Sequence, residues 1–322
     1  MNIAIMGAGG IANAMAYTVN AMDDAKLYAI GSRSLEKARE FAAKYNIEKA
    51  YGSYEDLVKD DNVDLVYIAT PHSHHYENAK LCIEHGRAVL CEKAFTVNAK
   101  QAEEIFKLAA EKNVFITEAF WTRFMPSISI IKELVDNEIG TPYMLTAQQG
   151  CSILHIPRIV EPELAGGALL DSTVYPINFA LMMFGWDYEK YNSSATFYKT
   201  GVDITNSITF MYPDGKLAVM NSSIASEIDS SVVISGTEGR VVIDGANNPR
   251  KISLFGRGGK HIRDVEIPKQ ISGYEYEVRS SMKAIKEGRL ECDEMPHEET
   301  LKVMRLLDQI RCDWNFKYPF EE

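Results

Sequence analysis

The chain is poor in cysteine, and no two cysteines have the spacing of a metal or redox motif. Its five cysteines are scattered over 322 residues without a Cys-x-x-Cys pair. An odd, dispersed set argues against a disulfide framework and is typical of a reducing compartment. No stretch approaches the roughly 18 uninterrupted apolar residues of a transmembrane helix, and Met1 leads into an apolar run without a basic leader. These absences predict a cytoplasmic protein with no membrane partner.

Positive charge is also scarce. The chain has 34 Lys and Arg residues against 45 Asp and Glu residues, a formal net charge of -11 at pH 7. Nucleic-acid grooves need concentrated basic side chains to neutralise phosphates, so we expect no nucleic-acid partner. Hydrophobic residues make up 46% and charged residues 25% of the chain, which is typical of globular proteins. A globular chain of this length suits two domains.

A glycine turn directly follows the first apolar run. Residues 3–6 predict a buried strand, and Gly7-Ala8-Gly9-Gly10-Ile11-Ala12 follows before a helical pattern. This Gly-x-Gly-x-x-Ala turn has the strand-to-helix setting of a dinucleotide fingerprint, in which glycines let the backbone approach a pyrophosphate at a helix N-terminus. An ordinary glycine turn is the alternative. The predicted cofactor contacts on this turn are Gly7, Gly9, Gly10 and Ile11.

The end of the second predicted strand bears on the choice between NAD and NADP. Residues 27–30 predict this strand, and Gly31-Ser32-Arg33-Ser34 follows it. NAD-preferring sites usually carry an acid about 20 residues after the glycines to bind the ribose 2′-hydroxyl, and this sequence has none there. Ser32, Arg33 and Lys37 instead offer hydrogen bonds and positive charge to a 2′-phosphate. The sequence therefore favours NADP over NAD, with a solvated loop arginine as the alternative.

Strand and helix patterns alternate through the first 120 residues. Further short strands are predicted to end at residue 51 and to cover 63–69, 88–91 and 114–117. Strands that alternate with helices form a doubly wound parallel sheet, because right-handed crossovers are nearly obligatory. We therefore expect an α/β fold whose first domain, residues 1–120, is a dinucleotide-binding Rossmann domain.

Polar side chains follow two of these strands, at the sheet edge where open α/β sheets bind ligands. Thr70-Pro71-His72-Ser73-His74-His75 follows one strand, and Glu92-Lys93 follows the next. The histidines raise a metal hypothesis, but no nearby carboxylate or cysteine completes a ligand set at usual spacing, so we expect no metal. For Lys93, a solvated strand-end lysine is the alternative. The residues predicted to contact the cofactor here are Thr70, Pro71, His72, His75, Glu92 and Lys93.

A second domain is predicted over residues 121–322. A proline-initiated helix over 126–137, a strand over 143–149 and a long loop over 151–165 come first. An apolar helix over 168–184 then places Asp171 and Tyr175 on one face, as either a functional or a structural pair. Strands at 193–197, 204–212, 216–224, 231–235, 241–244, 252–255 and 265–267, separated by glycine turns, predict an α+β domain with an open, predominantly antiparallel sheet.

Two helices, over 274–287 and 298–313, close the chain. If helices cover one face of the second sheet, its other face needs a cover as well. A symmetric homodimer, or a higher homo-oligomer that pairs through this sheet, would supply one.

Four motifs resemble those of one known family. They are Ala50-Tyr51-Gly52-Ser53-Tyr54-Glu55-Asp56-Leu57, Ala88-Val89-Leu90-Cys91-Glu92-Lys93, Glu118-Ala119-Phe120-Trp121-Thr122-Arg123-Phe124 and Gly166-Gly167-Ala168-Leu169-Leu170-Asp171. On these motifs the chain resembles, nearly end to end, the glucose-fructose oxidoreductase / inositol dehydrogenase (Gfo/Idh/MocA) family. It is most similar to the NADP-dependent branch of dihydrodiol and D-xylose 1-dehydrogenases.

The resemblance implies roles for particular residues. Lys93 and Tyr175 would carry the proton chemistry with Asp171 nearby, and Arg33 and Lys37 would bind the 2′-phosphate. The substrate residues would be Trp121, Arg123, Tyr175 and Tyr274, with a surface or interdomain salt bridge as the alternative for Arg123. The family usually has proline and glycine where this chain has Ala94 and Thr173. Alanine does not impose an extended backbone on Lys93, and the β-branched threonine predicts a narrower pocket or an altered approach to the nicotinamide.

The leading hypothesis is reversible hydride transfer between NADP and a hydroxyl-bearing carbon of a sugar or related cyclic polyol. Tyr175 would take the hydroxyl proton, and Lys93 would hold the oxygen and lower the pKa of the tyrosine. Reduction of a ketone or dicarbonyl sugar would use the same residues. A sensor that binds NADP and a sugar without turnover is an alternative from another class, and a paralogue whose glycine turn no longer binds nucleotide is a third.

Overall fold

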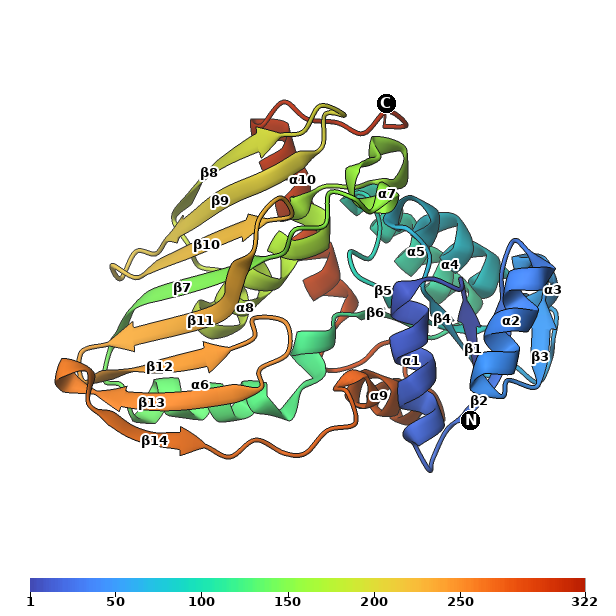
Figure 1. Cartoon of the computed structure of the whole chain (residues 1–322), viewed down its shortest axis with the longest axis horizontal. Coiled ribbons are helices and arrows are strands. Elements are labelled where there is room, and N and C mark those ends of the chain that lie inside the picture. The colour runs from blue at the N-terminus through green and yellow to red at the C-terminus, as the bar shows by residue number, and fades with distance from the viewer. Residues whose placement is uncertain (322) are drawn as a thin grey trace. The chain divides into compact units, whose positions relative to one another are not determined.

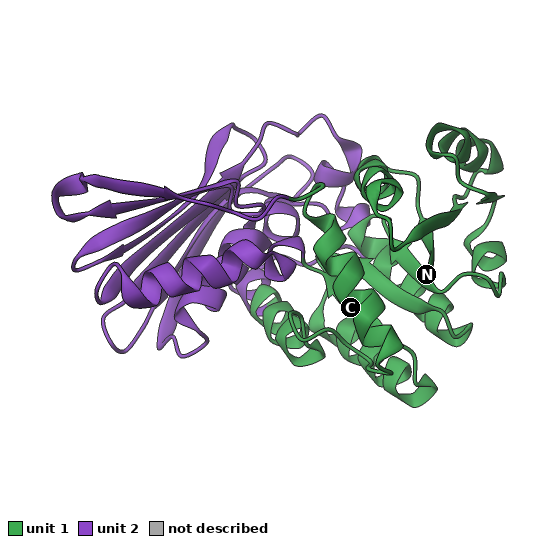
Figure 2. Cartoon of the chain, turned by 90° about the horizontal axis from the view of Figure 1, so that it is seen from below, with its two compact units in different colours: residues 1–120, 270–308 green, residues 121–269, 309–322 purple. Residues whose placement is uncertain are grey.

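In the computed structural model, which describes residues 1–321, the chain forms two compact units (Figure 2). Unit 1 holds residues 1–120 and 270–308, and unit 2 holds residues 121–269 and the stretch from Gln309 onward. The division after residue 120 matches the sequence analysis. Residues 270–308, which that analysis placed in the second domain, pack with unit 1 instead. The sequence of an amphipathic helix shows which of its faces is buried, but it does not show which of the two units that face packs against.

Unit 1 is built on a six-stranded parallel sheet in the order β3-β2-β1-β4-β5-β6 (Figure 1). This order confirms the predicted doubly wound sheet. All residues of β4 and β5 are buried, as expected for central strands covered on both faces. The strands are β1 (Asn2–Met6), β2 (Lys26–Gly31), β3 (Lys49–Tyr51), β4 (Leu65–Ile68), β5 (Ala88–Glu92) and β6 (Ile116–Ala119).

Two helices of unit 1 begin directly after capping side chains. Ser34 Oγ accepts from the Lys37 N–H at 3.3 Å, and Asn98 Oδ1 accepts from the Gln101 N–H at 3.0 Å. The last helix, α10, continues beyond residue 308 into unit 2. The helices are α1 (Gly10–Ala21), α2 (Leu35–Tyr45), α3 (Tyr54–Val58), α4 (His75–Glu84), α5 (Ala99–Lys112), α9 (Tyr274–Lys286) and α10 (His297–Asp313).

Unit 2 is built on an eight-stranded sheet in the order β14-β13-β12-β11-β7-β10-β9-β8. Every neighbouring pair except β7 and β10 is antiparallel, which confirms the predicted open, mostly antiparallel sheet. The strands are β7 (Pro142–Gly150), β8 (Lys190–Phe197), β9 (Asp203–Met211), β10 (Leu217–Ser223), β11 (Ile228–Gly236), β12 (Gly239–Asp244), β13 (Lys251–Gly256) and β14 (His261–Val265). The strand predicted at 265–267 is wrong, because the turn at Arg257–Gly259 lets pairing with β13 begin at His261.

Helices α6 (Pro126–Asn137) and α8 (Val174–Phe184) pack on the sheet of unit 2 (Figure 1). Side chains along β7 alternate accordingly, with Leu145 and Ala147 buried and Thr146 and Gln148 partly exposed. The predicted loop over 151–165 contains two short helical turns, α7 (Pro157–Val160) and Pro162–Leu164. Among the helices of residues 1–321, none is long and apolar enough to cross a membrane.

Candidate functional site

The glycine turn after β1 is shaped for a phosphate-bearing ligand. Gly7 adopts φ +103°, which favours glycine, and a Cβ atom there would lie 3.0 Å from the Ala69 carbonyl oxygen. A Cβ atom at Gly10 would meet no atom within 4 Å, so the start of α1 is open. The first N–H groups of a helix have no partner within it and can bind a diphosphate. All four predicted contacts lie on this turn: Gly7, Gly9, Gly10 and Ile11.

The end of β2 presents two exposed cations beside a buried hydroxyl. Arg33 and Lys37 are exposed, whereas Ser32 is buried and its Oγ accepts from the Ser34 N–H at 3.3 Å. Burial, and then the positive charge of Arg33, lower the pKa of His74. The charge of Arg33 therefore acts on the loop after β4. His74, which the sequence analysis considered only as a metal ligand, lies in the part of this loop that the charge affects.

A buried histidine ties down the loop after β4. The His75 ring is fully buried, and its nitrogens lie 2.8 Å from the Thr70 carbonyl oxygen and 2.9 Å from the Ala94 carbonyl oxygen. Burial lowers the pKa of His75 to about 4, so the ring is neutral at pH 7 and donates only one of these bonds. His75 would therefore act on a cofactor through the loop backbone. The other predicted contacts here are one buried residue, His72, and two partly exposed ones, Thr70 and Pro71.

His75 should make the protein less stable in acid. Its pKa is 6.5 in an unfolded chain and about 4 in the folded one, so its stabilisation is fully present above pH 6.5 and is lost as the pH falls toward 4. At about 1.4 kcal/mol for each pH unit between these values, the loss is about 3 kcal/mol. The substitution His75→Gln keeps a bond to one carbonyl and removes the titration. Urea unfolding should show a smaller loss from about pH 7 to about pH 4 for this variant than for the wild type; equal losses would exclude His75 as the cause.

Lys93 follows β5 and stands beside a glutamate that is turned into the protein. The Tyr67 hydroxyl donates to Glu92 Oε1, and the Lys93 backbone N–H donates to Glu92 Oε2 at 3.2 Å. Glu92 is 7% exposed, so its carboxylate holds the backbone at Lys93. Lys93 itself is partly exposed, and its peptide bond to Ala94 is cis.

A second buried glutamate in unit 1 was missed from the sequence. Glu277 of α9 is fully buried, and within residues 1–321 its carboxylate oxygens have no hydrogen-bond partner. Burial, and then the charge of Glu92, raise the pKa of Glu277 well above its ordinary value, which favours the protonated form. Tyr274, the predicted substrate residue, is 9% exposed, and burial followed by the charge of Glu92 raises its pKa too. The signal that could have revealed Glu277 is its spacing of three residues from Tyr274, which puts both residues on one face of the helix.

In unit 2, the predicted helix over 168–184 begins irregularly. Residues Leu169–Thr173 form a π-helical turn that passes into α8 at Val174. The expectation of a regular α-helix from residue 168 is therefore wrong, and the spacing rule that placed Asp171 and Tyr175 on one face does not apply across the turn. Such turns are frequent at functional sites. Tyr175 is 7% exposed, on the first turn of α8.

Asp171 is held by a residue of the long loop that sequence reasoning missed. Arg158 of α7 donates from Nη1 to Asp171 Oδ1 at 2.8 Å, and the side chains are 47% and 11% exposed. The only signal in the sequence was a basic residue in the predicted long loop over 151–165. Thr173, for which the sequence predicts a narrower pocket or an altered approach to the nicotinamide, has a fully buried side chain.

The predicted substrate residues after β6 lie on a 3₁₀ turn, Trp121–Phe124. Arg123 Nε donates to Asn178 Oδ1 at 2.9 Å, and Asn178 is buried in α8, one turn beyond Tyr175. Trp121 is partly exposed. This contact ties Arg123 to the helix that carries the candidate catalytic tyrosine.

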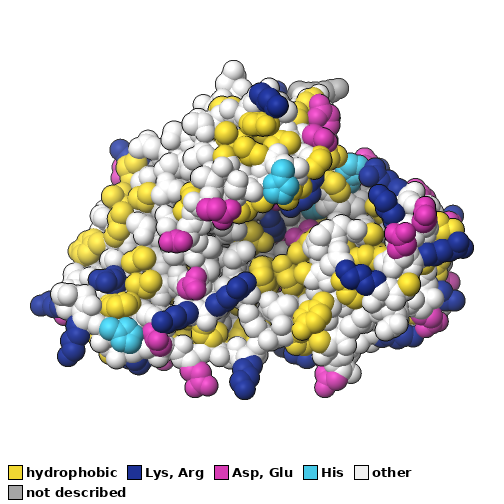
Figure 3. Space-filling model, viewed as in Figure 1, with side chains coloured by type: hydrophobic (Ala, Val, Ile, Leu, Met, Phe, Trp, Pro, Cys, Tyr) yellow, Lys and Arg dark blue, Asp and Glu magenta, His cyan; other side chains and the backbone are white. Residues whose placement is uncertain are grey.

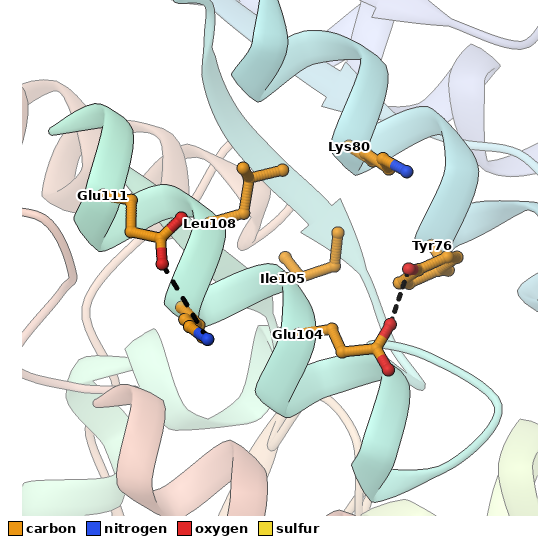
Figure 4. A pocket seen from close by; sticks show the side chains of 7 residues that line it. Tyr76, Lys80, Glu104, Ile105, Leu108 and Glu111 are labelled. Carbon is orange, nitrogen blue, oxygen red and sulfur yellow. Dashed lines mark hydrogen bonds and ion pairs between the residues drawn. The ribbon is translucent and has the colours of Figure 1, made fainter.

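A shallow groove of about 250 Å³ lies between α4 and α5 and contains none of the predicted site residues (Figure 4). Its lining is largely charged, and the Tyr76 hydroxyl donates to Glu104 Oε2 at 2.6 Å across it.

Among residues 1–321, no group of three or more His, Cys, Asp or Glu side chains is placed to hold a metal ion. On the face drawn in Figure 3, acidic and basic side chains are interspersed.

Both units match known protein families. The profile described as an oxidoreductase family with an NAD-binding Rossmann fold matches residues 1–120. The profile of the GFO/IDH/MocA C-terminal domain matches residues 128–242. These matches fall on the parallel sheet of unit 1 and on most of the sheet of unit 2.

Curated relatives are similar over nearly their whole length. The trans-1,2-dihydrobenzene-1,2-diol dehydrogenase of Mus musculus is 34% identical, over 98% of this chain and 97% of its own. The Homo sapiens enzyme of the same name is 33% identical, over 91% of this chain and 90% of its own.

Solved structures agree in fold. A 3-ketoreductase from Actinomadura kijaniata, in complex with NADP and TDP-benzene, has a TM-score of 0.88 at 23% identity, covering 97% of both chains. An aldose-aldose oxidoreductase from Caulobacter crescentus, complexed with glycerol, has a TM-score of 0.84 at 21% identity, covering 97% of this chain and 96% of its own.

Proposed function

This chain belongs to the GFO/IDH/MocA family of NAD(P)-dependent oxidoreductases, and we propose that it transfers a hydride between NADP and the hydroxyl or carbonyl carbon of a sugar or related cyclic polyol. The observation that carries the proposal is Lys93, a partly exposed lysine at the carboxyl end of β5 in a sheet whose glycine turn is open to a dinucleotide. The names of the curated relatives support a hydroxyl-bearing carbon as the reacting centre.

In this proposal the residues of both units have distinct tasks. The bound nicotinamide supplies the acceptor or donor of the hydride. Tyr175 takes the hydroxyl proton of the substrate at Oη, and Lys93 holds the substrate oxygen with Nζ. Its positive charge also favours the tyrosinate, because an unperturbed tyrosine with a pKa of about 10 is a poor base at neutral pH. Asp171, held by Arg158, accepts a hydrogen bond from the substrate. Trp121 and Tyr274 line the substrate.

The preference for NADP rests on two exposed cations, Arg33 just after β2 and Lys37 on the first turn of α2. Replacing Arg33 with alanine removes a charge-assisted bond to the 2′-phosphate, so KM for NADP should rise by about 30-fold while KM for NAD changes by less than about threefold. Arg39→Ala is the matched control, because Arg39 is also exposed and lies on α2, which begins two residues after Arg33. Steady-state kinetics with both cofactors would measure this, and equal changes for NAD and NADP would refute the role.

Two other functions remain distinguishable by experiment. Reduction of a ketone or dicarbonyl sugar would use the same residues in the opposite direction, and a sensor would bind NADP and a sugar without turnover. Nicotinamide absorbance should be followed with NADP and D-xylose, D-glucose or a trans-dihydrodiol, and with NADPH and a dicarbonyl sugar. Turnover in either direction supports the enzyme. Tight NADPH binding without turnover on the whole panel supports the sensor.

We also propose that the open face of the eight-stranded sheet pairs with a second copy of the chain. Thr146 of β7 lies between Val219 of β10 and Val233 of β11 in register, and all three are partly exposed on the face opposite the buried Leu145 and Ala147. Small and β-branched side chains suit a flat sheet interface. Sedimentation should give a dimer or a higher oligomer, and Thr146→Arg should give monomers; a monomeric wild type would refute the pairing.

A further inference from the structure

Thr173, at the end of the π-turn, has a buried hydroxyl with two polar neighbours. Its Oγ1 lies 3.0 Å from the Ala168 carbonyl oxygen and 2.9 Å from Asn206 Oδ1. Both neighbours are acceptors, so the single hydroxyl proton is shared between them. The side chain therefore points toward β9, and the residue that departs from the usual glycine of the family takes part in a buried polar contact.

Asn206 is also hydrogen-bonded to Asp203, and a β-bulge in β9 places both side chains on the same face of the strand. Thr205 pairs with Thr196 and Asp203 pairs with Phe197, which leaves Ile204 as the extra residue. The bulge breaks the alternation of β9, so Asp203 and Asn206 are both buried. Asn206 Nδ2 donates to Asp203 Oδ2 at 2.8 Å.

Asp203 closes the chain of contacts at the other end of the π-turn. Its Oδ2 also accepts from the Leu169 N–H at 2.9 Å, and a Cβ atom at Gly167 would lie 2.4 Å from its Oδ1. Burial raises the pKa of Asp203 to about 6, so the carboxylate is ionised at pH 7 and binds these donors as a charged acceptor. The first and last residues of the π-turn are thus joined through two side chains of one strand.

We infer that Thr173, Asn206 and Asp203 are positioning residues, which hold the π-turn in the form that orients Asp171 and Tyr175 for catalysis. A satisfied buried polar network fixes one arrangement of the backbone. Without it the turn would relax toward an α-helix, and removal of the extra residue would rotate Asp171 relative to Tyr175 by about 100°. Small misplacements of catalytic groups reduce rates strongly. This inference rests on the proposed roles of Asp171 and Tyr175.

The test compares variants that keep or remove the buried hydroxyl. Thr173→Val keeps the shape of the side chain and removes the hydroxyl donor, whereas Thr173→Ser keeps the donor. Asn206→Leu removes both hydrogen bonds of the Asn206 side-chain amide, to Thr173 and to Asp203. Thr205→Val is the matched control. Thr205 precedes Asn206 on β9, and its hydroxyl forms a hydrogen bond of 2.9 Å with Ser223 Oγ, outside the network. The measurements on the full chain are kcat, KM for the cofactor, the melting temperature and amide hydrogen exchange over residues 169–175.

We expect kcat to fall by about tenfold in Thr173→Val and Asn206→Leu, with KM for the cofactor within about twofold, and to recover in Thr173→Ser. Exchange of the 169–175 amides should accelerate in the first two variants and not in Thr205→Val. A lower melting temperature with unchanged kcat would reduce the network to a purely structural role and overturn the inference, as would wild-type exchange in Asn206→Leu. Tyr175→Phe, measured in parallel, separates the two ideas: if it keeps full turnover, the proposed role of Tyr175 fails, while exchange still reports on the network.

Discussion

Replacing Lys93 with methionine should lower kcat by roughly 1,000-fold and leave the affinity for NADP within about threefold. Methionine is unbranched and nearly as long as lysine, and it removes the charge that the proposal assigns to the substrate oxygen and to the tyrosine. The backbone at this position is held by Glu92, which Tyr67 anchors in the core. The substitution should therefore leave the strand end in place.

Lys107→Met is the control for this experiment. Lys107 lies on α5 of the same unit with its side chain 78% exposed, so its removal should change neither kcat nor cofactor affinity. NADPH binding measured by fluorescence separates chemistry from binding. Turnover of Lys93→Met near the wild-type rate would show that Lys93 is a solvated strand-end lysine.

Tyr175→Phe should lower kcat by roughly 100- to 10,000-fold, the range expected for loss of a general acid–base group. The ring stays in its buried position on α8, and only the hydroxyl is lost. Cofactor affinity should not change, since the predicted cofactor contacts lie in unit 1. Steady-state kinetics across a pH series would measure the effect. In the wild type kcat should rise with pH as the Tyr175 hydroxyl loses its proton, and the variant should lose this rise.

Tyr17→Phe provides the matched control, because Tyr17 is 61% exposed on α1. It should keep the wild-type kcat and pH profile. If Tyr175→Phe also kept them, another group would have to take the substrate proton, and Lys93 would be the first to test.

Local signals in the sequence were reliable guides to the fold. Helix α6 begins at Pro126 and ends at Asn137, as predicted, because a proline at the first turn and an apolar period are both local features. The Gly7 turn and the polar strand ends of the first domain were recognisable for the same reason. Their positions follow from the alternation of strands and helices, which fixes the edge of a parallel sheet.

Features that depend on distant contacts were not readable. Residues 168–184 are almost all buried, so no amphipathic period was present to reveal the extra residue of the π-turn. Thr173 and Asn206 are 33 positions apart, and only the bulge at Ile204 brings Asp203 to the same buried face as Asn206. The Arg158 contact with Asp171 also depends on the conformation of a loop. The residues that hold the candidate catalytic groups were therefore hidden, although the groups themselves were not.

The most direct test of the central claim follows the transferred hydrogen. The wild-type protein would be incubated with NADP and D-xylose, D-glucose or a dihydrodiol deuterated at the hydroxyl-bearing carbon, and the nicotinamide product analysed by mass spectrometry. The account predicts reduced nicotinamide that carries the deuterium. Reduced nicotinamide without deuterium, or no reduction with any sugar or polyol while NADPH binds tightly, would contradict it.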